Sequence, residues 1–166
     1  MERHDDALRQ LSLERARLLE VLGRVEDRWP DYLSLDMPGW PQPGAFLGHL
    51  ALLERHFLKE ARAIAAARDA ELRYMDDAWR DRILNLSRPR TWAQLYAALA
   101  RTRADLLAFV ARCPEPAWRR AVDHPSIAPD LRPRGVIKMI ARHDREHREE
   151  LEHRISLHLA GRAGRA

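Results

Sequence analysis

Apolar residues recur every three or four positions along four stretches of the chain, which is the pattern of amphipathic α-helices. The stretches run from about residue 3 to 28, 43 to 70, 91 to 113 and 133 to 159. In the first stretch Arg15 interrupts the apolar positions, and we expect it to mark an exposed or functional rim. Alternating apolar and polar runs, which are typical of strands, are nearly absent.

Residues with strong backbone preferences set the ends of these helices. Pro30 ends the first helix, because proline disfavours helical backbone in the residue before it. Thr91 and Gln94 have the spacing of a capping box, which predicts that the third helix opens here. The Cys113–Pro114 step ends that helix.

Two long connections separate the last three helices. Residues 71–90 indicate a loop with a short helical turn, and the segment "PEPAWRRAVDHPSIAPDLRP" carries five prolines and no periodicity. Connections of this length often cover a functional opening. Four amphipathic helices predict an all-α four-helix bundle, with an irregular helical array as the alternative. We expect one domain over residues 1–160 and a frayed tail over residues 161–166.

Composition and charge narrow the class of protein further. The net charge is +4, but basic and acidic residues alternate along the chain, as in "RHDREHREELEHR". Because they form no one-sign run, we do not expect a nucleic-acid partner. Cys113 is the only cysteine, so no internal disulfide can form. No apolar segment approaches the ~20 residues that span a bilayer, and we expect a cytoplasmic protein without a membrane partner.

Two histidines occupy core positions in the fourth helix. Steps of three and four residues from Ile140 lead to His143, His147 and then Leu151. The two imidazoles therefore lie on one face, ~40° apart and about 6 Å apart along the axis, a spacing that lets both bind one ion. A hydrogen-bonded pair of histidines at the edge of the core is the alternative.

A third ligand has to come from another helix. The second helix offers His49 and His56, which lie seven residues apart and hence within ~20° of each other. Both flank the apolar face of that helix, so periodicity does not choose between them. The remaining histidines are weaker candidates because of their places near a helix end or in a loop: His4, His124, His153 and His158.

Three stretches, in this order, cover nearly the whole chain: "PGWPQPGAFLGHLALLERHF", "MDDAWRDRILNLSRPRTWAQL" and "VIKMIARHDREHREELEHRI". Together they resemble the DinB/YfiT-like superfamily of four-helix metalloproteins. The resemblance implies that His49, His143 and His147 form a metal-binding triad, which favours His49 over His56. The chain departs from the family after Trp40, where a proline replaces the usual Ser or Thr. Proline is acceptable near a helix start.

Three neutral imidazoles leave open positions on a divalent ion, as catalytic sites do. Zn²⁺ or Ni²⁺ suit imidazole best, with Fe²⁺ and Mn²⁺ as alternatives. Glu150 and Glu146 project within ~20° and ~60° of His143. They are candidate catalytic bases at the rim of the site, or solvated acids on the helix surface. Asp144 is a candidate hydrogen-bond partner for one of the imidazoles that bind the metal, although its angular position on the helix is unfavourable for that contact.

The resemblance also implies a function. Characterised members of the superfamily include transferases and isomerases that use low-molecular-weight thiols, and others are described as metal-dependent hydrolases. We therefore expect a metal-dependent transferase that acts on a small-molecule substrate with such a thiol, in stress or detoxification. The alternatives are metal-assisted hydrolysis by a bound water and a non-catalytic metal-binding or interaction bundle. The resemblance is also compatible with a homodimer.

Overall fold

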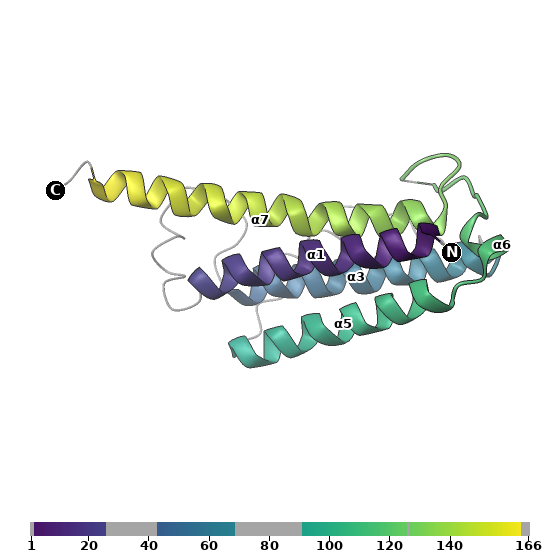
Figure 1. The fold of residues 1–166 in the computed structure, drawn as a ribbon, viewed down its shortest axis with the longest axis horizontal. Coiled ribbons are helices and arrows are strands. Elements are labelled where there is room, and N and C mark those ends of the chain that lie inside the picture. Colours follow the sequence, from purple (N-terminus) through teal and green to yellow (C-terminus); the bar gives the residue numbers. More distant parts are fainter. Residues whose placement is uncertain (1, 26–42, 69–90, 126, 164–166) are drawn as a thin grey trace.

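The computed structural model describes residues 2–25, 43–68, 91–125 and 127–163. These residues form four long helices and one short helix (Figure 1): α1 (Glu2–Val25), α3 (Pro43–Ala65), α5 (Trp92–Arg112), α6 (Glu115–Trp118) and α7 (Pro133–Ala163). The predicted all-α four-helix bundle is therefore confirmed. Within the described ranges the sole β feature is an isolated bridge between Val122 and Leu131.

The four long helices form two parallel pairs. α1 packs against α7 and α3 packs against α5, while contacts of α3 with α7 and of α1 with α5 close the ring. α1 and α7 run in one direction, and α3 and α5 run in the opposite direction (Figure 1). The end of α3 and the start of α5 therefore lie at opposite ends of the bundle. Bundles with this topology require a long crossover connection, which accounts for the long segment between these helices.

The start of α5 matches the predicted capping box. The backbone N–H of Gln94 donates to Thr91 Oγ1 at 3.2 Å, and the backbone N–H of Thr91 donates to Gln94 Oε1 at 3.0 Å. Two orphan donors at the first turn are thereby satisfied. The last residue of α5 is Arg112, next to the predicted stop.

The end of α3 differs from the prediction, because the helix stops at Ala65 and not near residue 70. Ala67 has a left-handed φ of 56°. The N–H of Arg68 donates to the carbonyl of Ala63 at 2.9 Å, and that of Ala67 donates to the carbonyl of Ile64 at 3.1 Å. This pair of bonds is a Schellman motif, which usually has glycine at the left-handed position. No glycine marks this end in the sequence.

The connection between α5 and α7, predicted to be irregular, contains α6 and the β-bridge. Trp118 ends α6 and is 1% exposed, so this connection contributes a large side chain to the core. α7 continues to Ala163, beyond the predicted end at about residue 159 and into the predicted tail. The predicted loop over residues 71–90 and the predicted helix end near Pro30 lie outside the described residues.

The core consists of two apolar clusters separated along the bundle axis. The first lies at the α6 end and has these large members: Leu11, Leu53, Phe57, Leu58, Ile64, Leu106, Val110, Trp118, Val136, Ile137 and Ile140. The second lies toward the other end: Leu18, Val21, Leu22, Val25, Phe46, Leu47, Leu50, Leu95, Leu99 and Leu151. Each long helix contributes charged or histidine side chains at the level between the clusters, and we call this level the polar layer.

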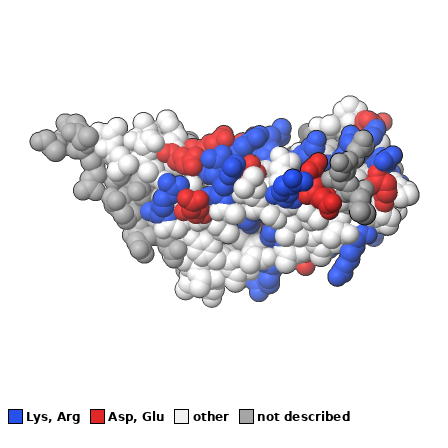
Figure 2. All heavy atoms as spheres, viewed as in Figure 1, with Lys and Arg blue, Asp and Glu red and all other residues white. Residues whose placement is uncertain are grey.

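The described helices include none that is both long and apolar enough to cross a membrane. Figure 2 shows basic and acidic side chains interspersed on the face in view. This arrangement agrees with the alternating charges read from the sequence.

Candidate metal centre

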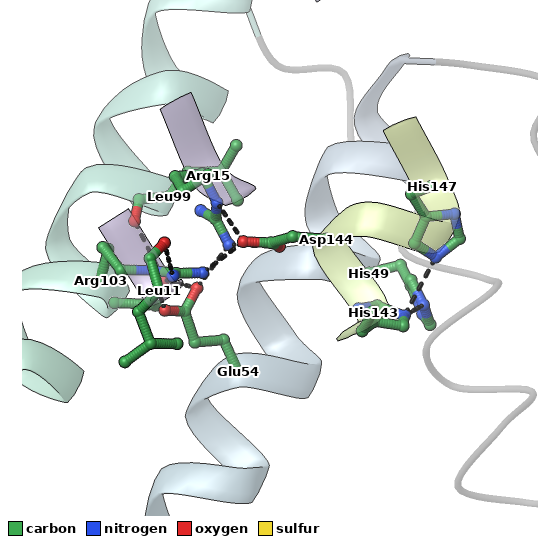
Figure 3. Close-up of polar contacts among 10 residues, drawn as sticks. Leu11, Arg15, His49, Glu54, Leu99, Arg103, His143, Asp144 and His147 are labelled. Carbon is green, nitrogen blue, oxygen red and sulfur yellow. Dashed lines mark hydrogen bonds and ion pairs between the residues drawn. The ribbon is translucent and has the colours of Figure 1, made fainter. Parts of the chain in front are cut away.

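Three histidine side chains converge in the polar layer (Figure 3). His49 of α3 and His143 of α7 place their Nε2 atoms 2.8 Å apart, and the Nε2 atoms of His143 and His147 lie 3.0 Å apart. One nitrogen from each ring lies within 4.8 Å of the other two, a cluster that could hold a metal ion. The structure therefore brings together the three residues that the sequence and the family resemblance select.

The packing of α3 against α7 explains this convergence. His143 and His147 stand one helical turn apart on α7, so their rings project toward the same neighbour. The ring of Phe46 on α3 packs edge-on to His147, with centroids 5.0 Å apart. His56 lies on the same face of α3 but two turns further along, where its Nε2 is 3.7 Å from Glu60 Oε1. The position along the axis of α3 therefore determines that His49, and not His56, meets the histidines of α7.

Burial keeps two of these histidines uncharged. Burial, and secondarily the neighbouring His147, lowers the pKa of His49 to about 4. Burial, followed by the charges of His147, His49 and Arg15, lowers the pKa of His143 to about 2. Both rings are therefore neutral near pH 7, which is the form that binds a metal.

The donor set fits one divalent ion. Imidazole nitrogens bind Zn²⁺ at ~2.0–2.1 Å, so tetrahedral ligand atoms lie roughly 3.3 Å apart. Two of the three Nε2 separations, 2.8 and 3.0 Å, are within a few tenths of an ångström of that value, and all three ligand atoms lie within 4.8 Å of one another. The rings are half-buried, which shields them from water while leaving access to the site.

Of the two predicted catalytic acids, Glu150 is the one placed at the histidines. Its Oε2 lies 2.9 Å from Nδ1 of His147, and its Oε1 accepts from Nη2 of Arg154 at 2.8 Å. Burial raises the pKa of Glu150, but the hydrogen bonds from His147 and Arg154 outweigh it and hold that pKa below its usual value. Each carboxylate oxygen thus has a partner on α7, which ties the side chain of Glu150 to its own helix.

Glu146 lies away from the triad. Its carboxylate is 57% exposed and pairs with Nε of Arg142 at 3.3 Å. This is the solvated helix-face position that the sequence left open as the alternative for both acids. The placement gives no support for Glu146 as a base.

Asp144 and Arg15 correct the predictions made for them. Asp144 is 1% exposed, and its described hydrogen bonds come from arginines and not from an imidazole. Arg15 is 5% exposed, so it marks the interior and not a rim. Its Nε and Nη2 donate to the two oxygens of Asp144, each at 3.0 Å.

These residues belong to a buried charge cluster that links all four long helices: Arg15, Glu54, Arg103 and Asp144 (Figure 3). Arg103 Nη2 donates to Asp144 at 2.6 Å, and Arg15 Nη2 donates to Glu54 at 2.8 Å. Two cations and two anions balance, which limits the cost of burying them. Each member stands where the apolar pattern of its own helix requires a core residue, and this is the sequence signal that identifies the cluster.

Among the other histidines with described side chains, none joins the triad. His124 is buried and its Nε2 contacts Glu60 at 3.1 Å, while its Nδ1 accepts from the backbone of Ile127. His4 stacks on Trp118 with ring centroids 4.7 Å apart. His153 is exposed, and the side chain of His158 lies outside the described residues.

The protein is therefore a helical bundle with a candidate metal centre, which lies between the antiparallel helices α3 and α7. Residues 10–151 match the DinB superfamily, and the chain belongs to that superfamily. The match includes all three histidines of the triad. No curated protein and no solved structure gives a significant match to this chain.

Proposed function

We propose that this protein is a metal-dependent transferase that uses a low-molecular-weight thiol, with His49, His143 and His147 as the metal ligands. The observation that carries the proposal is the convergence of three Nε2 atoms on one point. Zn²⁺ and Ni²⁺ suit an all-imidazole set best, and Fe²⁺ and Mn²⁺ are alternatives. When bound, such an ion supplies Lewis acidity at an open coordination position, where a thiol or water loses its proton more readily.

The placement of Glu150 favours a thiol over water as the activated group. Hydrolysis by water uses a base within hydrogen-bond reach of the proton it removes. Both oxygens of Glu150 already have partners in His147 and Arg154. A thiol that coordinates a divalent ion is deprotonated without a separate base. Membership of the DinB superfamily is compatible with this choice, because its characterised members include thiol-dependent transferases as well as proteins described as hydrolases.

Metal content is the first test of this proposal. The protein is purified without a polyhistidine tag, and bound metals are measured by elemental analysis. We expect about one divalent ion per chain, and His143→Ala should remove most of it because two ligands alone bind weakly. A wild-type protein that stays metal-free after incubation with Zn²⁺ and Ni²⁺ contradicts the proposal.

Activity is the second test. The metal-loaded protein is incubated with a small electrophile and either cysteine or glutathione, and loss of free thiol is followed with time. Thiol consumption that requires both the metal and His143 supports a transferase. Ester hydrolysis that requires the metal but no thiol contradicts the transferase and supports a metal-dependent hydrolase. If neither reaction occurs across a panel of thiols and esters, the non-catalytic bundle is the better account.

A further inference from the structure

Glu150 stands between a triad histidine and a buried arginine on one face of α7. His147 precedes it by three residues and Arg154 follows it by four, so all three side chains are neighbours on the helix surface. The side chains of His147, Glu150 and Arg154 are 12%, 18% and 5% exposed. Water is therefore largely excluded from both contacts of the carboxylate.

The chemistry of the partners fixes the direction of these hydrogen bonds. A guanidinium only donates and an ionised carboxylate only accepts. Arg154 thus donates to Glu150 Oε1, and the Nδ1 that lies 2.9 Å from Glu150 Oε2 has to carry the proton. A neutral His147 protonated at Nδ1 has its lone pair on Nε2.

That lone pair lies on the side of the ring where the triad needs it. Nε2 of His147 is 3.0 Å from Nε2 of His143, which in turn is 2.8 Å from Nε2 of His49. The edge-on contact with Phe46 also restricts rotation of the His147 ring. Glu150 and Phe46 therefore favour the tautomer and the ring orientation of His147 that metal binding requires.

We propose that Glu150 is a positioning residue for the metal centre: it fixes the tautomer and orientation of His147, and Arg154 fixes Glu150. The inference rests on the proposed function, since it assigns a role at the same three-histidine site. Carboxylates that accept from a ligating histidine change metal affinity by roughly 10- to 100-fold when they are removed. A catalytic base would instead affect turnover without affecting affinity.

The test compares Glu150→Ala and Glu150→Gln with Glu146→Ala. Glu146 is a matched control, because it lies on the same helix and also pairs with an arginine, but at an exposed position. Zn²⁺ affinity is measured by competition with a chromogenic chelator. We expect Glu150→Ala to weaken binding about 10- to 100-fold. Glu150→Gln should lose less, because its amide oxygen still accepts from Nδ1, and Glu146→Ala should match the wild type.

A second measurement does not depend on the metal. Nitrogen NMR of the histidine rings in the metal-free protein reports which ring nitrogen of His147 carries the proton. We expect the Nδ1–H tautomer in the wild type and in Glu146→Ala, and a shift toward Nε2–H in Glu150→Ala. This readout separates positioning from a general loss of folding, which would disturb all histidine signals together.

The outcomes distinguish the inference from the proposed function. If the wild type binds Zn²⁺ and Glu150→Ala binds it equally well with an unchanged tautomer, the positioning role is wrong and the metal centre stands. If turnover alone falls, Glu150 is a base after all. If the wild type binds no metal, the proposed function is wrong and the role of Glu150 at a metal centre is wrong with it. The tautomer measurement then still shows whether Glu150 orients His147.

Discussion

Arg15 and Asp144 form a bidentate ion pair in the interior of the bundle. Nε and Nη2 of the guanidinium each lie 3.0 Å from an oxygen of the carboxylate, and both side chains are almost fully buried. The pair joins α1 to α7, and Asp144 directly follows the triad residue His143. Adjacent residues of α7 therefore contact different helices: Asp144 pairs with Arg15 of α1, and His143 contacts His49 of α3.

Replacing Asp144 by alanine should destabilise the protein strongly. The substitution leaves Arg15 and Arg103 buried with Glu54 as the remaining carboxylate of the cluster. Removing one partner of a buried ion pair costs about 3–5 kcal/mol of unfolding free energy. The measurement is urea unfolding of the metal-free protein, followed by circular dichroism.

Glu146→Ala is the control for that experiment. Glu146 forms an exposed pair on the same helix, and surface substitutions of this kind change stability by about 0.5 kcal/mol or less. Equal stabilities for the two variants would show that the charge cluster does not hold the bundle together.

The predictable part of the fold is the part that depends on local spacing. Helix periodicity identified the four long helices, and the pair Thr91 and Gln94 marked one start because a capping box is a local signal. His143 and His147 stood out for the same reason, since four residues always return a helix to the same face. These features do not depend on which helices pack together.

The other features depend on tertiary packing. Arg15 interrupts an apolar stripe, but its partner Asp144 lies on a helix far along the chain, at a level set by the parallel packing of α1 and α7. His49 and His56 share one face of α3, and the axial position of α7 decides which of them meets the triad. Periodicity predicts which face of a helix is buried. It does not predict which helix packs against that face or at which axial position.

Substitution of each of these two histidines tests the choice directly. His49→Ala should remove most bound metal, because its Nε2 lies 2.8 Å from that of His143. His56→Ala should keep the metal, because Nε2 of His56 lies 3.7 Å from Glu60 Oε1 and His56 is not part of the triad. Elemental analysis of both variants after loading with Zn²⁺ gives the answer. Retention of metal by His49→Ala, or its loss from His56→Ala, would contradict the triad.

The end of α3 offers a prediction about stability. Ala67 holds a left-handed φ of 56°, a conformation that costs a residue with a Cβ roughly 1–2 kcal/mol and costs glycine almost nothing. Glycine also loses more conformational entropy on folding, by roughly 0.5–1 kcal/mol. We therefore expect Ala67→Gly to stabilise the protein by about 0.5–1 kcal/mol in urea unfolding. Ala66→Gly is the control, since Ala66 is a neighbouring exposed position without this backbone strain, and it should not stabilise.

The lowered pKa values of the triad predict how the stability of the metal-free protein depends on pH. His143 has an ordinary pKa of 6.5 when unfolded and about 2 when folded, and His49 falls to about 4. As the pH falls below 6.5, the unfolded chain binds protons that the folded chain does not. Stability is therefore full above that pH and declines below it, by up to about 1.4 kcal/mol per pH unit for each histidine.

Urea unfolding of the metal-free protein at several values between about pH 4.5 and 7 measures this decline. His143→Ala should flatten the dependence, because it removes the histidine with the largest shift. The control is His153→Ala, which replaces an exposed histidine on the same helix and leaves the triad intact. If the three proteins lose stability in parallel on acidification, the buried rings are not held neutral by the fold, and the triad is not preorganised to bind a metal.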